Sequence, residues 1–273
     1  MTSTDGGDPR AAKALAVAHA SAALDSDSRV LLWHAGTPHT GRLLAPVLAI
    51  ARSLGRELVC VARPGYGGSP RRRGRSVAAG AREAALLMQQ HDLRDVLIAG
   101  YSGGGPHALA VAAAVPARIR AVVVTGCPAP YAAGDEWFAG MVDPGALRSA
   151  VSGIDARDAH PEVWEPRSFT ARDYAALEAE WGVLGEDAGS ADALTDGGAV
   201  DDDVAFVTDW GFSLSSVSAP VTIAHGSSDR IIPVAHAAML AERLRDARLA
   251  IHEGDGHVSV LEHLAKHLVE ADG

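Results

Sequence analysis

Short apolar runs alternate with alanine-rich stretches along most of this 273-residue chain. Runs dense in Val, Leu and Ile are typical of strands buried on both faces, so the alternation predicts an α/β fold, a mostly parallel sheet with helices on both faces. The predicted strands are Arg29 to Trp33, Leu58 to Ala62, Val96 to Gly100, Ile119 to Thr125, Val221 to His225 and Arg248 to His252. The predicted helices are Leu43 to Leu54, Val77 to His91, Pro106 to Val115, Val234 to Leu244 and Val258 to Val269, the second with Ser76 as its N-cap.

One stretch, residues 131–215, breaks this alternation after the strand that ends near Gly126. It holds 18 Asp and Glu against 4 Arg, which leaves 16 acids and 20 bases from the chain totals of 34 and 24. The stretch therefore carries −14 and the remainder +4. Such a shift predicts an acidic helical lid, 131–215, inserted in a core made of 1–130 and 216–273, above the carboxyl ends of the strands.

The lid acids leave two interpretations open. If they edge the entrance to a site, their field disfavours anionic acyl groups. In the other interpretation Asp201, Asp202 and Asp203 only solvate an exposed surface.

The net charge of −10 argues against a nucleic-acid partner, because affinity for phosphates comes from clustered Lys and Arg. One basic cluster exists, and its Gly/Pro-rich surroundings predict a solvated loop: Arg71, Arg72, Arg73 and Arg75. No apolar run reaches the length of a membrane span. Residues Ala11 to Leu24 are too interrupted by Lys13 and His19 for a signal peptide, so we expect a cytoplasmic protein that acts on a small molecule without a membrane.

Two cysteines, Cys60 and Cys127, match neither a disulfide framework nor a zinc spacing. We expect both to be reduced thiols in the core. The sequence accordingly predicts no metal and no cofactor.

The pentapeptide Gly100-Tyr101-Ser102-Gly103-Gly104 lies directly between a predicted strand and a predicted helix. This G-x-S-x-G context is typical of a nucleophile elbow, in which small neighbours let a tight turn close and expose the serine hydroxyl. Ser102 is therefore the candidate nucleophile.

A serine hydroxyl needs a base to accept its proton and an acid to orient that base. His257 and Asp229 each follow a predicted strand near the C-terminus, so both lie at the same edge of the sheet as Ser102. Asp255 is the weaker candidate for the acid because it stands only two residues before His257. His107, five residues after Ser102, is expected to be structural.

Acyl transfer also needs hydrogen-bond donors for an oxyanion. The Gly103 N–H, next to the nucleophile, is one candidate. The second is the Thr37 N–H in the loop His34-Ala35-Gly36-Thr37-Pro38, which ends the first predicted strand.

From Arg29 to its C-terminus the chain resembles the α/β-hydrolase fold family, in particular its lidded serine hydrolase branch, which is esterase-like and proline-iminopeptidase-like. Two motifs carry the resemblance beyond the triad order: Arg63-Pro64-Gly65-Tyr66-Gly67-Gly68-Ser69 and Gly103-Gly104-Gly105-Pro106-His107-Ala108. Ala62 stands where such proteins commonly have an acid, and Ala35-Gly36 replaces the usual His-Gly pair. Family members usually begin with a β-hairpin, whereas Ala11 to Leu24 has a helix-favouring composition.

The resemblance implies a serine hydrolase that cleaves a small to medium ester, thioester, lactone or activated amide through an acyl-enzyme. Two alternatives use the same scaffold: a lyase, cyclase or perhydrolase, and a silent ligand-binding protein. The candidate substrate-binding residues are Trp137, Phe138, Met141 and Trp210, although aromatic lid residues also form small cores of their own.

Overall fold

The computed structural model describes residues 17–19, 24–194 and 197–273. Within them lies one seven-stranded sheet of order β1-β3-β2-β4-β5-β6-β7. Its strands are β1 (Val17–His19), β2 (Val30–His34), β3 (Glu57–Val61), β4 (Val96–Tyr101), β5 (Ile119–Thr125), β6 (Val221–Gly226) and β7 (Ala247–His252). Strands β2 to β7 pair in parallel, and β1 pairs antiparallel with β3.

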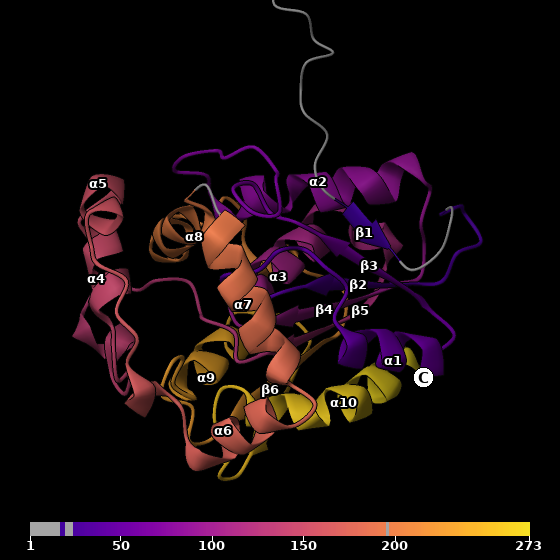
Figure 1. Ribbon diagram of the computed structural model, residues 1–273. Helices are drawn as coiled ribbons and strands as arrows, with labels where there is room; N and C mark the ends of the chain where they lie inside the picture. Colours follow the sequence, from indigo (N-terminus) through magenta and orange to yellow (C-terminus); the bar gives the residue numbers. More distant parts are fainter. Residues whose placement is uncertain (1–16, 20–23, 195–196) are drawn as a thin grey trace, which may run out of the picture.

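Helices cover both faces of this sheet (Figure 1). One face packs against α1 (Ala45–Ser53) and α10 (Leu264–Asp272), and the other against α2 (Val77–Gln90), α3 (Gly104–Ala114) and α9 (Ala235–Ala241). The short 3₁₀ helices η1 (Pro116–Arg118) and η5 (Ser259–His263) adjoin β5 and α10. The hydroxyl of Ser76 accepts the Ala79 N–H at 3.2 Å and so caps α2 as predicted.

Strand β2 illustrates why the strands consist of continuous apolar runs. Val30 and Leu32 contribute to the core on the α2 and α3 face, whereas Leu31 and Trp33 contribute to the core on the α1 and α10 face. Because alternate side chains of a strand point to opposite faces, a strand covered on both sides has no polar face to show.

The six predicted strands and four of the five predicted helices are present within a few residues of their expected ends. The helix predicted from Val258 begins as the 3₁₀ helix η5 and becomes an α-helix, α10, only at Leu264. Strand β1 was not predicted. It lies within Ala11 to Leu24, whose composition favours a helix, and its pairing with β3 outweighs that local preference. The remainder of that stretch, apart from Leu24, lies outside the described residues.

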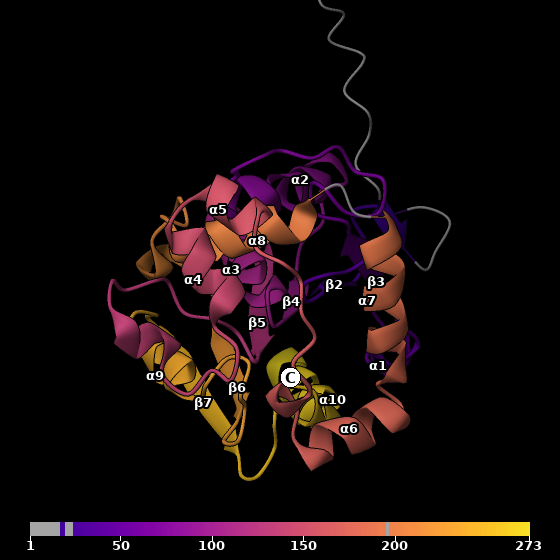
Figure 2. The same cartoon turned by 60° about the vertical axis from the view of Figure 1, so that its left-hand side comes forward.

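Between β5 and β6 the chain forms a series of helices, which lie in two places on the sheet domain (Figure 2). They are η2 (Asp135–Phe138), α4 (Gly145–Val151), α5 (Ile154–Asp158), η3 (Pro166–Ser168), α6 (Ala171–Glu178), α7 (Gly182–Leu194), α8 (Gly198–Val207) and η4 (Leu214–Ser216). In its described residues, 131–194 and 197–215, this inserted segment contains no strand. Nowhere in the described chain is a helix both long and apolar enough to cross a membrane.

The basic cluster forms a solvated loop only in part: Arg72 and Arg73 are exposed, but Arg71 and Arg75 are drawn inward by acids of the inserted segment. Arg71 binds Asp201 at 2.8 Å, and Arg75, which is buried, binds Asp202 at 2.6 Å. Arg73 reaches Asp155 at 2.5 Å on the surface. The positive core and the negative segment therefore meet through ion pairs.

Candidate active site

Ser102 occupies the turn between β4 and α3 with a φ of +51°, a left-handed conformation that non-glycine residues rarely adopt. Its N–H donates to the Thr125 carbonyl at 2.8 Å, which anchors the turn to β5. A Cβ on Gly104 would stand 2.0 Å from the His34 carbonyl oxygen, and one on Gly100 would stand 2.8 Å from the Ala108 Cβ. The turn therefore closes only with glycine at these two positions.

His257 and Asp229 meet Ser102 from two other loops. The His257 Nε2 atom lies 2.9 Å from the Ser102 Oγ, and its Nδ1 atom lies 2.7 Å from the Asp229 Oδ2. Asp229 follows β6 and His257 follows β7, so adjacent parallel strands deliver both side chains to one edge of the sheet. A carboxylate on Nδ1 favours the tautomer whose Nε2 accepts the serine proton.

Local backbone groups hold the Asp229 carboxylate in place. Its Oδ1 atom accepts the N–H groups of Ile231 and Ile232, each at 2.9 Å. Burial alone raises the pKa of Asp229, but the neighbouring His257 and the hydrogen bonds from His225 and His257 together lower it far below the usual value. Asp229 is therefore an anion throughout the range in which proteins are assayed.

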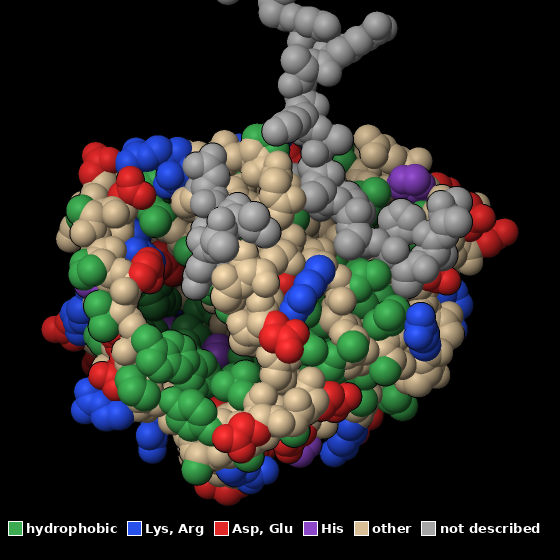
Figure 3. Space-filling model, viewed as in Figure 1, with side chains coloured by type: hydrophobic (Ala, Val, Ile, Leu, Met, Phe, Trp, Pro, Cys, Tyr) green, Lys and Arg blue, Asp and Glu red, His purple; other side chains and the backbone are tan. Residues whose placement is uncertain are grey.

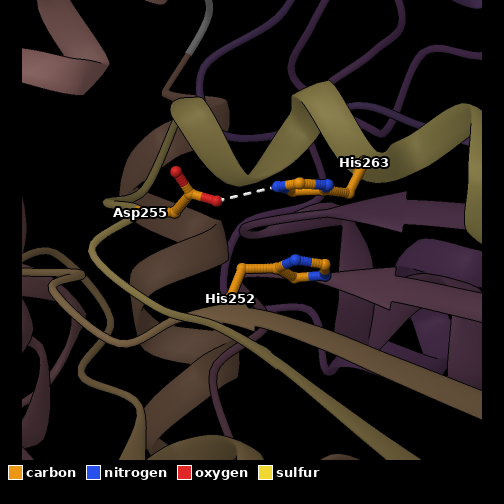
Figure 4. A group of neighbouring side chains, drawn as sticks. All are labelled: His252, Asp255 and His263. Atoms are coloured by element: carbon orange, nitrogen blue, oxygen red, sulfur yellow. Dashed lines mark hydrogen bonds and ion pairs between the residues drawn. The ribbon is translucent and has the colours of Figure 1, made fainter.

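Asp255, the weaker candidate, does not contact the His257 ring. It pairs with His263 at 2.9 Å (Figure 4) and with Arg172 at 2.7 Å. His107 is structural as predicted: it is buried in α3, with its Nδ1 atom 2.9 Å from the Gly103 carbonyl.

Three potential metal ligands, on His252, Asp255 and His263, lie within 4.8 Å of one another (Figure 4). The two imidazole rings are stacked, with centroids 3.7 Å apart and planes inclined by 11°. A metal ion binds a ring nitrogen close to the ring plane, where the lone pair lies. Two nearly parallel planes share no such position, so the arrangement is not a coordination geometry.

The two residues that carry the candidate oxyanion donors lie against each other. A Cβ on Gly103 would stand 2.3 Å from the Thr37 Oγ1, which places the loop after β2 directly beside the elbow. Neither the Thr37 N–H nor the Gly103 N–H donates a hydrogen bond to another described residue. Both are thus available to a substrate oxygen.

A buried carboxylate from α8 organises the loop that carries Thr37. Asp202 is fully buried and accepts the Thr37 hydroxyl at 2.7 Å. It also pairs with Arg63 at 2.8 Å, which in turn donates to the carbonyls of Ala35 and Gly36 at 2.6 and 2.9 Å. Sequence reasoning missed this role, and the only signal for it was the opposite charge of the two parts of the chain.

A second acid of the inserted segment holds the loop of His257. Asp173, also fully buried, accepts the Val258 and Ser259 N–H groups at 2.7 and 2.9 Å, immediately after His257. It caps α6 at the same time, through reciprocal hydrogen bonds with Thr170. Its position within an amphipathic helix gave no sign of the tertiary contact.

Ser102 and His257 open into a cavity of about 220 Å³. Its apolar wall comes from both parts of the chain, and the inserted segment contributes Trp164, Phe169 and Leu177. On this face of the molecule, hydrophobic side chains surround a hollow in which histidine is visible (Figure 3).

The residues expected to bind substrate do not line this cavity. Trp137 and Phe138 pack with Met141 in a small core inside the inserted segment, as the alternative interpretation held. Trp210 lies in the main core and borders a separate, more open hollow. The sequence could not identify Trp164 or Phe169 because the loop that contains them has no periodicity.

A family model described as the alpha/beta hydrolase fold matches residues 29–264. Since the match spans most of the chain, this protein belongs to the alpha/beta hydrolase fold family. It is an enzyme, a hydrolase of the esterase type.

Among curated proteins, the chain is similar to the pimeloyl-[acyl-carrier protein] methyl ester esterase of Aromatoleum aromaticum. The two are 31% identical over 248 residues, which cover 85% of this chain and 90% of that protein. An esterase of Exiguobacterium antarcticum superimposes with a TM-score of 0.68 at 18% identity, over 94% of this chain and 95% of that one. A bromoperoxidase of Bacillus anthracis gives 0.66 at 19% identity over the same shares, so these structures establish the fold alone.

Proposed function

We propose that this protein is a serine esterase that cleaves a small to medium carboxylic ester through an acyl-enzyme on Ser102. The observation that carries the proposal is the hydrogen-bonded chain from the Ser102 hydroxyl through His257 to Asp229, at 2.9 and 2.7 Å. A base within hydrogen-bond reach is what a serine hydroxyl needs to act as a nucleophile.

In the first half of the reaction, His257 Nε2 accepts the hydroxyl proton while the Ser102 oxygen forms a bond to the ester carbonyl carbon. The carbonyl electron pair moves onto its oxygen, which takes hydrogen bonds from the Thr37 and Gly103 N–H groups. When this pair returns, the bond to the alcohol breaks and the alcohol leaves with the proton from His257. Water then attacks the acyl-enzyme by the same route and releases the acid.

Two observations favour a compact ester as substrate. The cavity beside Ser102 measures about 220 Å³ and has a largely apolar wall, which suits a short to medium acyl chain better than a polymer. The curated relative is named for the hydrolysis of a methyl ester, so the same bond type is the first to test.

We further propose that residues 131–215 act as a lid on a core made of 1–130 and 216–273. The lining of the cavity supports this division, because Trp164, Phe169, Leu177 and Leu184 belong to the inserted segment while Ser102 and His257 belong to the core. Closing such a segment over a substrate excludes bulk water and so strengthens the hydrogen bonds to the oxyanion.

The decisive experiment compares Ser102→Ala with the matched control Ser190→Ala, an exposed serine on α7. With p-nitrophenyl butyrate, Ser102→Ala should lose about 10⁴-fold or more in kcat, and the control should match the unaltered protein. A fluorophosphonate should label one serine per chain, only where Ser102 is present. Near-normal turnover by Ser102→Ala, with contaminating esterase excluded, would remove Ser102 from the mechanism. Labelling without ester hydrolysis would favour the lyase, cyclase or perhydrolase alternative, and the absence of labelling would favour the silent ligand-binding protein.

A further inference from the structure

His39 lies in the loop after β2, two residues beyond Thr37, and lines the cavity of Ser102 and His257. Its side chain is buried, with 1% of the residue exposed, and its ring lies 4.4 Å from the ring of Tyr66. Within the described part of the chain, neither ring nitrogen of His39 has a hydrogen-bond partner. A buried polar group in this state loses its hydration without compensation, which is unusual in native proteins.

Two other polar side chains around the cavity already have partners. The Thr37 hydroxyl donates to Asp202 at 2.7 Å. The buried carboxylate of Asp187 accepts the Thr40 hydroxyl at 2.5 Å and pairs with Arg42 at 3.0 Å. His39 therefore holds uncommitted, buried ring nitrogens at the edge of a cavity whose wall is largely apolar.

Position distinguishes His39 from His34. Both ring nitrogens of His34 also lack partners among the described residues, but His34 ends β2 inside the core and does not line the cavity. An unpartnered imidazole alone is thus not a binding site in this chain. Both rings are equally buried, but only His39 borders the cavity, so a small turn of its side chain would bring a ring nitrogen to a molecule bound there.

Resting on the proposed esterase function, we infer that His39 is a specificity-determining residue that binds an uncharged hydrogen-bonding group of the ester, such as a ketone or an amide. A neutral imidazole offers one N–H donor and one acceptor nitrogen, which match these groups. The Asp187 carboxylate, which also lines the cavity, disfavours an anionic group in the same space.

The electrostatic surroundings keep His39 in its neutral form. Burial and the nearby Arg63 guanidinium hold the pKa of His39 well below its ordinary value, although Asp202 acts in the opposite direction. His39 therefore acts as a hydrogen-bonding group and not as a counter-ion for a carboxylate.

Three p-nitrophenyl esters of equal chain length test this inference: hexanoyl, 5-oxohexanoyl and N-acetyl-β-alanyl. The last two place a carbonyl at the same position, and the last adds an N–H. The same groups are also placed on the alcohol side of a butyrate ester, so that binding from either side of the ester bond is detected. Each measurement is the ratio of kcat/KM for a polar ester to that for its hydrocarbon match, which is independent of the folded fraction of a preparation.

In at least one series we expect a polar-to-hydrocarbon ratio of about five- to tenfold, the size of one net hydrogen bond. His39→Leu should bring this ratio to about one, and His39→Gln, which keeps a donor and an acceptor, should retain part of it. Ratios near one in both series, or a ratio unchanged in His39→Leu, overturn the inference while leaving the esterase function intact. A chain that hydrolyses none of these esters and is not labelled by a fluorophosphonate refutes the esterase function, and this inference with it.

Discussion

Replacing Asp202 by Asn tests whether the charge of this carboxylate holds the structure together. Asn keeps the shape of the side chain but leaves two buried guanidinium groups, on Arg63 and Arg75, without their counter-ion. Removing one partner of a buried ion pair costs about 3–5 kcal/mol, because the remaining charge stays desolvated. A domain of ordinary stability has about 5–15 kcal/mol in total, so Asp202→Asn should lose about a fifth of it or more.

Urea unfolding followed by circular dichroism measures this loss. With a slope of about 3 kcal/mol/M, the midpoint should fall by about 1–1.7 M. Asp155→Asn is the matched control, because Asp155 pairs with Arg73 of the same basic cluster but its side chain is 91% exposed, and its midpoint should stay in place. Equal midpoints for Asp202→Asn and the unaltered protein would refute the argument.

Acid supplies an independent check on the same residue. Burial alone raises the pKa of Asp202, but the Arg63 and Arg75 guanidiniums hold it well below the usual value. A depressed carboxyl pKa contributes stability that is complete above the unfolded pKa, about 4, and is lost as the pH falls towards the folded value. The difference in unfolding free energy between the unaltered protein and Asp202→Asn should therefore shrink below about pH 4, and a difference that grows there would contradict the assignment.

Two further predictions concern the triad acid and the thiols. Asp229→Asn should lower kcat by about 10⁴-fold, because the His257 tautomer changes, whereas Asp255→Asn should cost less than about tenfold, since Asp255 faces away from that ring. Steady-state kinetics rank the two variants, and the reverse order would assign the role of triad acid to Asp255. Burial raises the pKa of Cys60 to about 12 and that of Cys127 well above its usual value. Neither thiol should therefore react with a disulfide reagent until urea unfolds the chain, and rapid reaction in the native protein would contradict their burial.

The sequence predicted the sheet and brought Ser102, Asp229 and His257 together because the carboxyl ends of parallel strands meet at one edge. It could not predict which loop side chains face the cavity. Trp164 lies in an irregular loop, where neither a period of two nor one of 3.6 indicates a direction. The error over the solvated arginine loop has a similar origin, because local composition describes Arg75 but not the Asp202 that neutralises it.

The opposite net charges of the inserted segment and the rest of the chain include one specific ion pair, between Asp202 and Arg63. Position 62, where similar proteins commonly have an acid, is closely packed: a Cβ on Gly41 would stand 2.6 Å from the Ala62 Cβ. The counter-ion of Arg63 comes instead from α8, as Asp202.

Asp202 and Asp173 thus tie the inserted segment to two separate loops of the core. Asp202 holds the loop of Thr37, and Asp173 holds the backbone directly after His257. Displacing the segment would withdraw both carboxylates, expose buried cations and leave backbone N–H groups without acceptors. Docking of the inserted segment therefore stabilises both the loop that carries the candidate oxyanion donor Thr37 and the loop that carries His257. A variant that loosens this docking should lose catalytic rate before it loses the fold of the sheet, because the ties reach the loops and not the strands.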